Sequence, residues 1–155
     1  MSFRIRGLDP RIFGHLYGAR DAELARHLAE RQVADKSPGF PDRIRLSDAS
    51  PGETLLLVNF VHQPAATPYR ASHAVYIREG ALEPYEGVDE IPPALAIRPL
   101  SLRAFDASGR IVDARLADGA VAAGAIEDLL GDPRAAYLHA HYARFGCYAA
   151  RVERA

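Results

Sequence analysis

The chain has 155 residues, of which 48% are hydrophobic and 25% are charged. This size and composition are typical of one folded domain with its own core, and they exclude a largely disordered chain. The formal net charge of −1 provides no basic excess for a phosphate backbone or an anionic lipid surface. We therefore predict a single domain over residues 1–155 that binds neither nucleic acid nor membranes.

Cysteine content and hydropathy indicate the compartment. The single cysteine, Cys147, has no partner within the chain for a disulfide, and residues 1–6 lack the apolar core of a secretory signal. The longest apolar run, residues 55–61, is too short to cross a bilayer as a helix. We expect a cytoplasmic protein.

The first third of the chain predicts a strand followed by two short helices. Residues 3–8 alternate apolar and basic side chains, as in a strand. Asp9, which is followed by proline, is a typical helix start, and Asp21 can cap a second helix that carries Leu28 on its apolar face. After a turn-rich segment, residues 43–46 alternate again and predict another strand.

The middle of the chain predicts the centre of the sheet. Residues 54–62 are apolar at nearly every position, which is typical of a strand buried on both faces. A loop leads to a second strand at residues 73–78. Proline, glycine and acidic residues dominate residues 80–93, which we expect to be an irregular surface segment.

The last third predicts two hairpins separated by a helix. The expected elements are strands at 99–105 and 110–116, a helix at 118–130, and a hairpin formed by residues 136–142 and 147–152. Together these elements predict an α+β fold. It has a mainly antiparallel sheet of about six to seven strands, two short N-terminal helices, and one helix before a C-terminal hairpin.

The C-terminal hairpin gathers polar side chains on one face. If Gly146 sets the register, His139 lies opposite Arg151, His141 lies opposite Ala149, and Tyr148 belongs to the apolar face. The polar face is then lined by Tyr137, His139, His141, Cys147, Arg151 and Glu153. These groups can exchange protons, ligate a metal or bind an anion.

Three kinds of site are compatible with this face. A divalent metal would use His139 and His141, with His73, His62 or a carboxylate as a third ligand. A nucleophilic enzyme would use Cys147 activated by His141. In an enzyme of either kind, the catalytic candidates are His73, His141 and Cys147.

The hypothesis that requires the least special geometry is a pocket for an anionic or polar small molecule. Its lining residues would be Tyr69, Arg70, His73, His139, His141 and Arg151. The rival class is a non-catalytic module for protein interaction or homo-oligomerisation, which would use sheet edges or residues 80–93. We expect Arg103 to form only a surface ion pair with Asp113.

Four segments carry a family resemblance. They are residues 37–41 (SPGFP), 59–64 (NFVHQP), 67–74 (TPYRASHA) and 146–152 (GCYAARV). In combination these segments resemble a bacterial family catalogued as domain of unknown function 1203, and the similarity runs over essentially the whole chain. The resemblance implies no established activity, and it assigns no catalytic residue.

Overall fold

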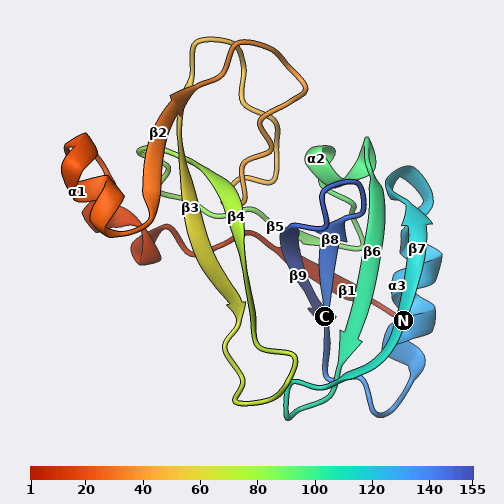
Figure 1. Ribbon diagram of the computed structural model, residues 1–155. Coiled ribbons are helices and arrows are strands. Elements are labelled where there is room, and N and C mark those ends of the chain that lie inside the picture. The colour runs from red at the N-terminus through yellow and green to blue at the C-terminus, as the bar shows by residue number, and fades with distance from the viewer.

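The computed structural model describes residues 1–155, which form two antiparallel sheets flanked by short helices (Figure 1). The six-stranded sheet has the order β5 (Glu86–Val88), β1 (Phe3–Arg6), β9 (Tyr148–Arg154), β8 (Tyr137–Tyr142), β6 (Pro99–Phe105) and β7 (Ile111–Asp118). The three-stranded sheet has the order β2 (Ala29–Val33), β3 (Thr54–Gln63) and β4 (Ala71–Arg78). The helices are α1 (Asp21–Arg26), α2 (Pro93–Ala96) and α3 (Ala123–Gly131), with 3-10 turns at Pro10–Ile12, Gly14–Leu16 and Gly119–Val121. The predicted α+β class is confirmed, as are the antiparallel sheet, the helix before the last hairpin and that hairpin itself.

Several local expectations at the N-terminal end were wrong. The helix expected after Asp9 is a pair of 3-10 turns, and α1 ends before Leu28, which is exposed and has a φ of 54°. Residues 43–46 form turns instead of a strand, although Ile44 and Leu46 are buried. In these segments tertiary contacts bury the apolar side chains without regular backbone pairing, so alternation alone is misleading. The short strands β2 and β5 were not predicted.

The larger core covers one face of the six-stranded sheet. The inward residues of β1, β6, β8 and β9 pack there against α2 and α3. Gly119 lies so close to the backbone that a Cβ built on it would stand 1.9 Å from the carbonyl oxygen of Leu95. Only glycine permits this approach, which seats the 3-10 turn before α3 against α2.

A smaller core lies under the three-stranded sheet. Leu56, Val58 and Phe60 occupy alternate positions of β3 and face the N-terminal turns and Tyr148 of β9. The other face of β3 was expected to be buried, but Asn59 and Val61 on that face are exposed. One face of the second half of β3 is therefore open, while its other face is turned toward the six-stranded sheet.

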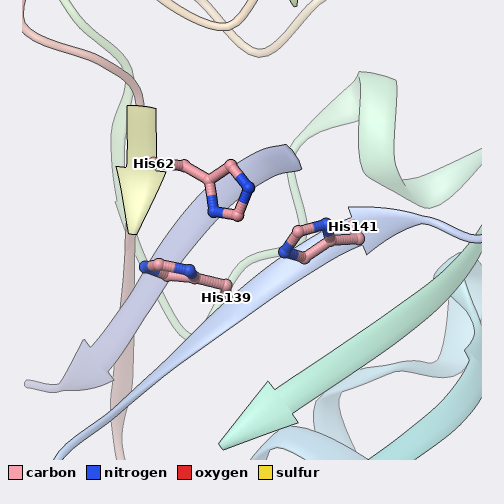
Figure 2. A group of neighbouring side chains, drawn as sticks. All are labelled: His62, His139 and His141. Carbon is pink, nitrogen blue, oxygen red and sulfur yellow. The ribbon is translucent and has the colours of Figure 1, made fainter. Parts of the chain in front are cut away.

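The end of β3 meets the second, polar face of the six-stranded sheet beside β8 (Figure 2). The side-chain amide of Gln63 donates to the hydroxyl of Tyr137 at 2.9 Å, which ties the end of β3 to the start of β8. The loop after β3 also contacts the β6–β7 turn, where Thr67 Oγ1 donates to the carbonyl of Gly109. These contacts hold the two sheets together on the side where the histidines lie.

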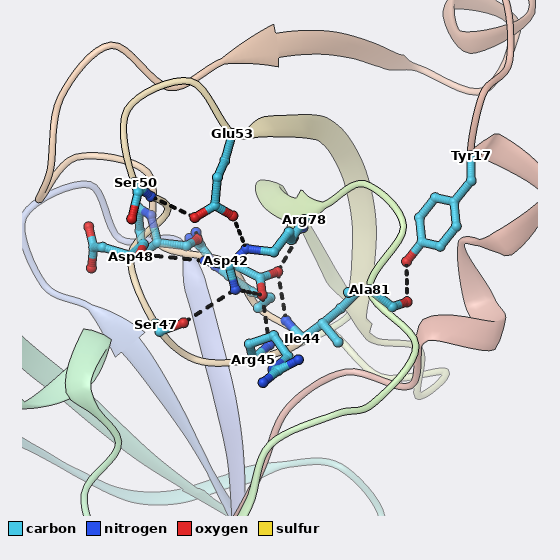
Figure 3. A network of polar contacts seen from close by, with 12 residues as sticks. Tyr17, Asp42, Ile44, Arg45, Ser47, Asp48, Ser50, Glu53, Arg78 and Ala81 are labelled. Carbon is cyan, nitrogen blue, oxygen red and sulfur yellow. Dashed lines mark hydrogen bonds and ion pairs between the residues drawn. The ribbon is translucent and has the colours of Figure 1, made fainter.

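A buried carboxylate organises the loop before β3 (Figure 3). Asp42 is fully buried and accepts hydrogen bonds from the backbone N–H groups of Ile44, Arg45 and Arg78 at 2.7–3.0 Å. The Arg78 guanidinium lies 3.4 Å from Asp42 and 2.6 Å from Glu53. A buried carboxylate is stable when hydrogen-bond donors of the protein take the place of its hydration water. Because two of the donors of Asp42 belong to Arg78, these bonds fix the loop to β4.

None of the helices combines the length and the apolar character that a membrane-spanning helix requires.

Replacing Asp42 by asparagine is expected to destabilise the protein by about 2–3 kcal/mol, because the amide NH₂ presents donors to backbone N–H groups that need an acceptor. The free energy of unfolding should be measured by urea denaturation, with Glu127→Gln, an exposed change on α3, as the control. Equal stability of the two variants would show that the Asp42 network is not structurally important.

Candidate functional site

Four histidines from both sheets converge on one point of the polar face. His62 lies in β3, His73 in β4, and His139 and His141 in β8; we call these four residues the histidine cluster. The ring centroid of His62 is 5.0 Å from that of His141 and 5.6 Å from that of His139 (Figure 2). It is 4.6 Å from the ring centroid of His73. Residues separated by up to 79 positions in the sequence thus form one compact group.

Alternation along β3 places His62 in the cluster. Its side chain continues the row of Leu56, Val58 and Phe60, and a register shift with β4 occurs between Val61 and Gln63. The three apolar members of the row build the smaller core, which fixes the strand. The fourth position therefore presents an imidazole toward β8, where the two sheets meet.

The β8–β9 register differs from the expected one by a bulge. His139 lies opposite Arg151 as predicted, but His141 pairs with Tyr148 instead of Ala149, because the register shifts between Ala140 and His141. Because of this shift, the side chains at the start of β9 point to the opposite faces from those expected. Tyr148 accordingly joins the histidines, with its ring stacked on His62 at 5.3 Å.

Cys147 is placed away from the histidines by the same shift. It packs against the larger core, and its sulfur accepts a hydrogen bond from Arg43 Nη2 at 3.1 Å. The buried Arg43 also donates to the carbonyls of Tyr148 and Pro41, at 2.9 and 2.6 Å. The structure therefore does not bring Cys147 to His141 as a nucleophile and base, and Arg43 holds the start of β9 in this orientation.

The cluster leaves several buried nitrogen atoms without a hydrogen-bond partner. These atoms are both ring nitrogens of His62, Nδ1 of His139 and Nε2 of His141. The other nitrogen of His141, Nδ1, lies 2.9 Å from the carbonyl oxygen of Gly146. A proton on Nδ1 makes that contact a hydrogen bond and leaves Nε2 with a free lone pair, which is the form that a metal-binding histidine takes.

Burial keeps the imidazoles uncharged at neutral pH. Loss of hydration lowers the pKa of His62 to about 4, and it lowers the pKa values of His139 and His141 to about 3. Charges on neighbouring histidines and on Arg103 add to this effect. Loss of hydration also lowers the pKa of His73, and the charges of Arg103 and Arg43 lower it further. Neutral imidazoles keep the lone pairs that ligate metals.

Three of the four histidines have the arrangement of a metal site. One nitrogen from each of His62, His139 and His141 can be chosen so that all three atoms lie within 4.8 Å of one another. In a tetrahedral zinc site with bonds of about 2.0–2.1 Å, ligand nitrogens are about 3.3 Å apart. Closing the set around an ion would bring the nitrogens up to about 1.5 Å nearer to one another.

His73 supports this set from outside. Its Nδ1 accepts the backbone N–H of Tyr148 at 3.2 Å, and its ring lies nearly parallel to that of His62. The hydrogen bond occupies one nitrogen, and the stacking limits rotation of His62. His73 thus packs on the ring of His62 while it is itself anchored to the start of β9.

Arginines lie on both sides of His139 in the sheet. Arg103 of β6 and Arg151 of β9 are its register partners. Arg151 is engaged elsewhere, since it donates to Glu153 at 2.5 Å and covers the ring of Tyr137 at 3.8 Å. The expected ion pair of Arg103 with Asp113 was wrong, because Arg103 lies opposite Ala114 and Asp113 lies one position further along, on the other face.

The remaining predicted ligand residues lie at the margin. Tyr69 and Arg70 are exposed in the loop before β4, and the guanidinium of Arg70 donates to the carbonyl of Pro64. The sequence analysis missed Tyr148 and Arg103 as neighbours of the cluster. Neither residue has a clear signal in the sequence, because the pairing of β6 with β8 and the bulge that brings in Tyr148 are decided by contacts between distant strands.

The comparisons with known proteins can now be set beside this geometry. The sequence model of the family described as "Protein of unknown function (DUF1203)" matches residues 39–154, which confirms the resemblance seen in the sequence. The matched segment contains the whole histidine cluster, Arg103 and Arg43, whereas His15 and His27 lie outside it. No curated protein and no solved structure matches the chain.

The metal-free protein is expected to lose stability as the pH falls from about 6.5 toward 3. The folded-state pKa values of the buried histidines lie below the unfolded value, so protons bind preferentially to the unfolded chain over this range. When the pH is lowered from 7 to 5, the free energy of unfolding of His139→Gln should fall by about 1–2 kcal/mol less than that of the wild type. Urea denaturation with EDTA present measures the difference, and the exposed His15→Gln is the control. A wild-type pH dependence in His139→Gln would contradict the burial argument.

Proposed function

The chain belongs to the DUF1203 family of proteins of unknown function, and we propose that it is a metal-dependent enzyme acting on a small polar molecule. In this proposal His62, His139 and His141 hold a divalent transition metal ion. The observation that carries the proposal is the convergence of three buried imidazoles, from two sheets, whose free nitrogens lack any partner.

The energetic argument rests on the unpaired nitrogens. A buried polar atom without a hydrogen bond costs about 1–3 kcal/mol, and four such atoms occur in these three rings. A structural core of histidines would require each of these atoms to be paired. An ion reduces this cost by accepting one lone pair from each ring, which leaves one nitrogen of His62 unpaired.

The ligand types indicate which ions suit the site. Neutral imidazoles are typical ligands of zinc, iron, cobalt, nickel and copper, whereas magnesium and calcium require oxygen ligands. Three protein ligands leave at least one coordination position for water or substrate, as in catalytic zinc sites. An ion bound there would supply Lewis-acid chemistry, which acidifies water and polarises an oxygen-containing group.

The surroundings support a small polar ligand. His139 and His141 are buried, whereas His73, Arg103, Tyr137 and Arg151 are only partly covered. Access is therefore limited to one polar rim, which combines a donor-rich surface with the aromatic ring of Tyr137. This arrangement joins two hypotheses from the sequence, the small-molecule pocket and the metal site. The cytoplasmic location and the bacterial origin stay predictions.

A second candidate function, homo-oligomerisation, is favoured by an apolar surface at the outer edge of the six-stranded sheet. Leu116 of β7 and Ile97 are exposed and line a groove that also reaches Ala143. β7 is an edge strand with unpaired backbone groups on one side. Pairing of two such edges would bury these side chains without involving the histidine cluster.

The wild-type protein, purified without a histidine tag or chelator, is expected to contain about one transition metal ion per chain. His139→Ala/His141→Ala should lose this ion, because only His62 of the three ligands remains. Elemental analysis measures the metal content. His15→Ala/His27→Ala is the matched control, because it also removes two histidines, at exposed positions on the opposite side of the smaller core.

Two results would contradict the metal site. One is a wild-type protein that stays metal-free even after incubation with zinc, cobalt and iron(II) salts. The other is equal metal content in the two double variants, which would place the ion elsewhere on the chain.

For the second candidate, Leu116→Lys is expected to reduce the molar mass in solution to that of one chain, because a lysine at an edge strand opposes pairing. Light scattering coupled to size-exclusion chromatography measures the mass of the wild type and of the variant. Identical masses would exclude the β7 edge as an interface.

A further inference from the structure

Arg103 places a positively charged side chain beside the proposed metal site. We propose that its guanidinium binds the anionic group of the substrate, so that the enzyme acts on small carboxylates or similar oxyanions. This inference rests on the proposed metal site and names the class of molecule that it takes.

The first support is position. Arg103 in β6 is the register partner of His139 in β8, and Ser101 is the partner of His141. Cross-strand partners project from the same face of a sheet about 5 Å apart at their Cβ atoms. Arg103 therefore extends from the face that carries the histidine cluster, and its charge lowers the pKa of all four histidines.

The second support is the absence of any protein anion beside Arg103. Its one side-chain contact is Ser101 Oγ at 3.3 Å, although loss of hydration lowers its pKa. Every other partly buried arginine of the six-stranded and three-stranded sheets is paired with a carboxylate. These arginines are Arg4 with Glu86, Arg31 with Glu79, Arg78 with Glu53, and Arg151 with Glu153. Arg98, after α2, pairs with Asp48, and the buried Arg43 is satisfied by carbonyl oxygens.

The charge of the proposed site defines the ligand. No carboxylate belongs to the three-histidine set, so a divalent ion held there keeps its full positive charge. Arg103 adds another positive charge at the partly covered rim. A small carboxylate has two oxygens and could satisfy both, with one oxygen on the metal and the other on the guanidinium.

The size of the ligand follows from burial. His141 is fully covered and His139 is 2% exposed, and the rings of Phe105 and Tyr137 stack beside His139. The apolar groove at β6–β7 and the groove beside β2 and β3 are lined by other residues. A ligand can reach the cluster only past the partly covered polar side chains around these buried rings, which favours a molecule of few atoms without a large apolar group.

Acetate binding to the cobalt(II)-loaded protein tests this inference. Visible absorption of the bound cobalt is recorded at neutral pH while sodium acetate is added. In the wild type and in Arg110→Met, an exposed change on the same hairpin, acetate should alter the spectrum at the same concentration. Arg103→Met should load cobalt fully but require about 10- to 100-fold more acetate, because a charge-assisted hydrogen bond is lost.

A second variant guards against misfolding. Arg103→Lys keeps the charge but lacks the planar fork, so its acetate affinity should lie between those of the wild type and Arg103→Met. Circular dichroism and thermal melting establish that each variant is folded.

The outcomes separate the two proposals. A wild-type protein that does not bind cobalt overturns the metal site, and the role of Arg103 with it. If the proteins load cobalt fully, two results overturn the role of Arg103 and leave the metal site standing. One is a wild-type spectrum that acetate does not change, and the other is equal acetate affinity of Arg103→Met and Arg110→Met.

Discussion

The contact between the end of β3 and the polar face of the six-stranded sheet is the constraint on which the site depends. One face of that sheet is closed by α2 and α3 over the larger core, so the second face is free to carry polar side chains. The end of β3 covers this second face only beside β8. The side chain in contact there is His62, which follows the apolar residues Leu56, Val58 and Phe60 on the same face of β3. The histidines are buried because two independently stabilised sheets meet at that point.

This arrangement places weak bases where they cannot be hydrated, and the surrounding structure has to tolerate the cost. Buried imidazoles are least costly when they are neutral, and neighbouring positive charges make protonation still less favourable. A neutral imidazole with a free lone pair is a good ligand for a transition metal. Burial and unpaired nitrogens therefore make the cluster unfavourable as part of a hydrophobic core, and the same features suit it to bind an ion.

Rigidity at the site is provided by polar anchors outside it. Asp42 fixes the loop before β3 to β4 (Figure 3). Arg43 in the same loop connects it to the start of β9. Gln63 joins β3 to Tyr137 of β8. Each anchor is a buried or partly buried polar group with defined partners, and such groups specify one arrangement of the elements more strictly than apolar packing does. Together they determine which face of each strand the histidines occupy.

Local pattern by itself determined the α+β class, both C-terminal hairpins, α3, and the shared face of His139 and His141, because periodicity and turn chemistry act over a few residues. It also marked His62 and His73 as candidate ligands. Only the tertiary structure decided that His62 lies beside His139 and His141, that His73 stacks on His62, and that Arg103 lies in the same region without a carboxylate. It also decided, through a one-residue bulge, that Tyr148 and not Cys147 faces the cluster. These decisions depend on register and on contacts between distant strands, and a shift of one residue in either reverses the face of a side chain without changing the sequence pattern.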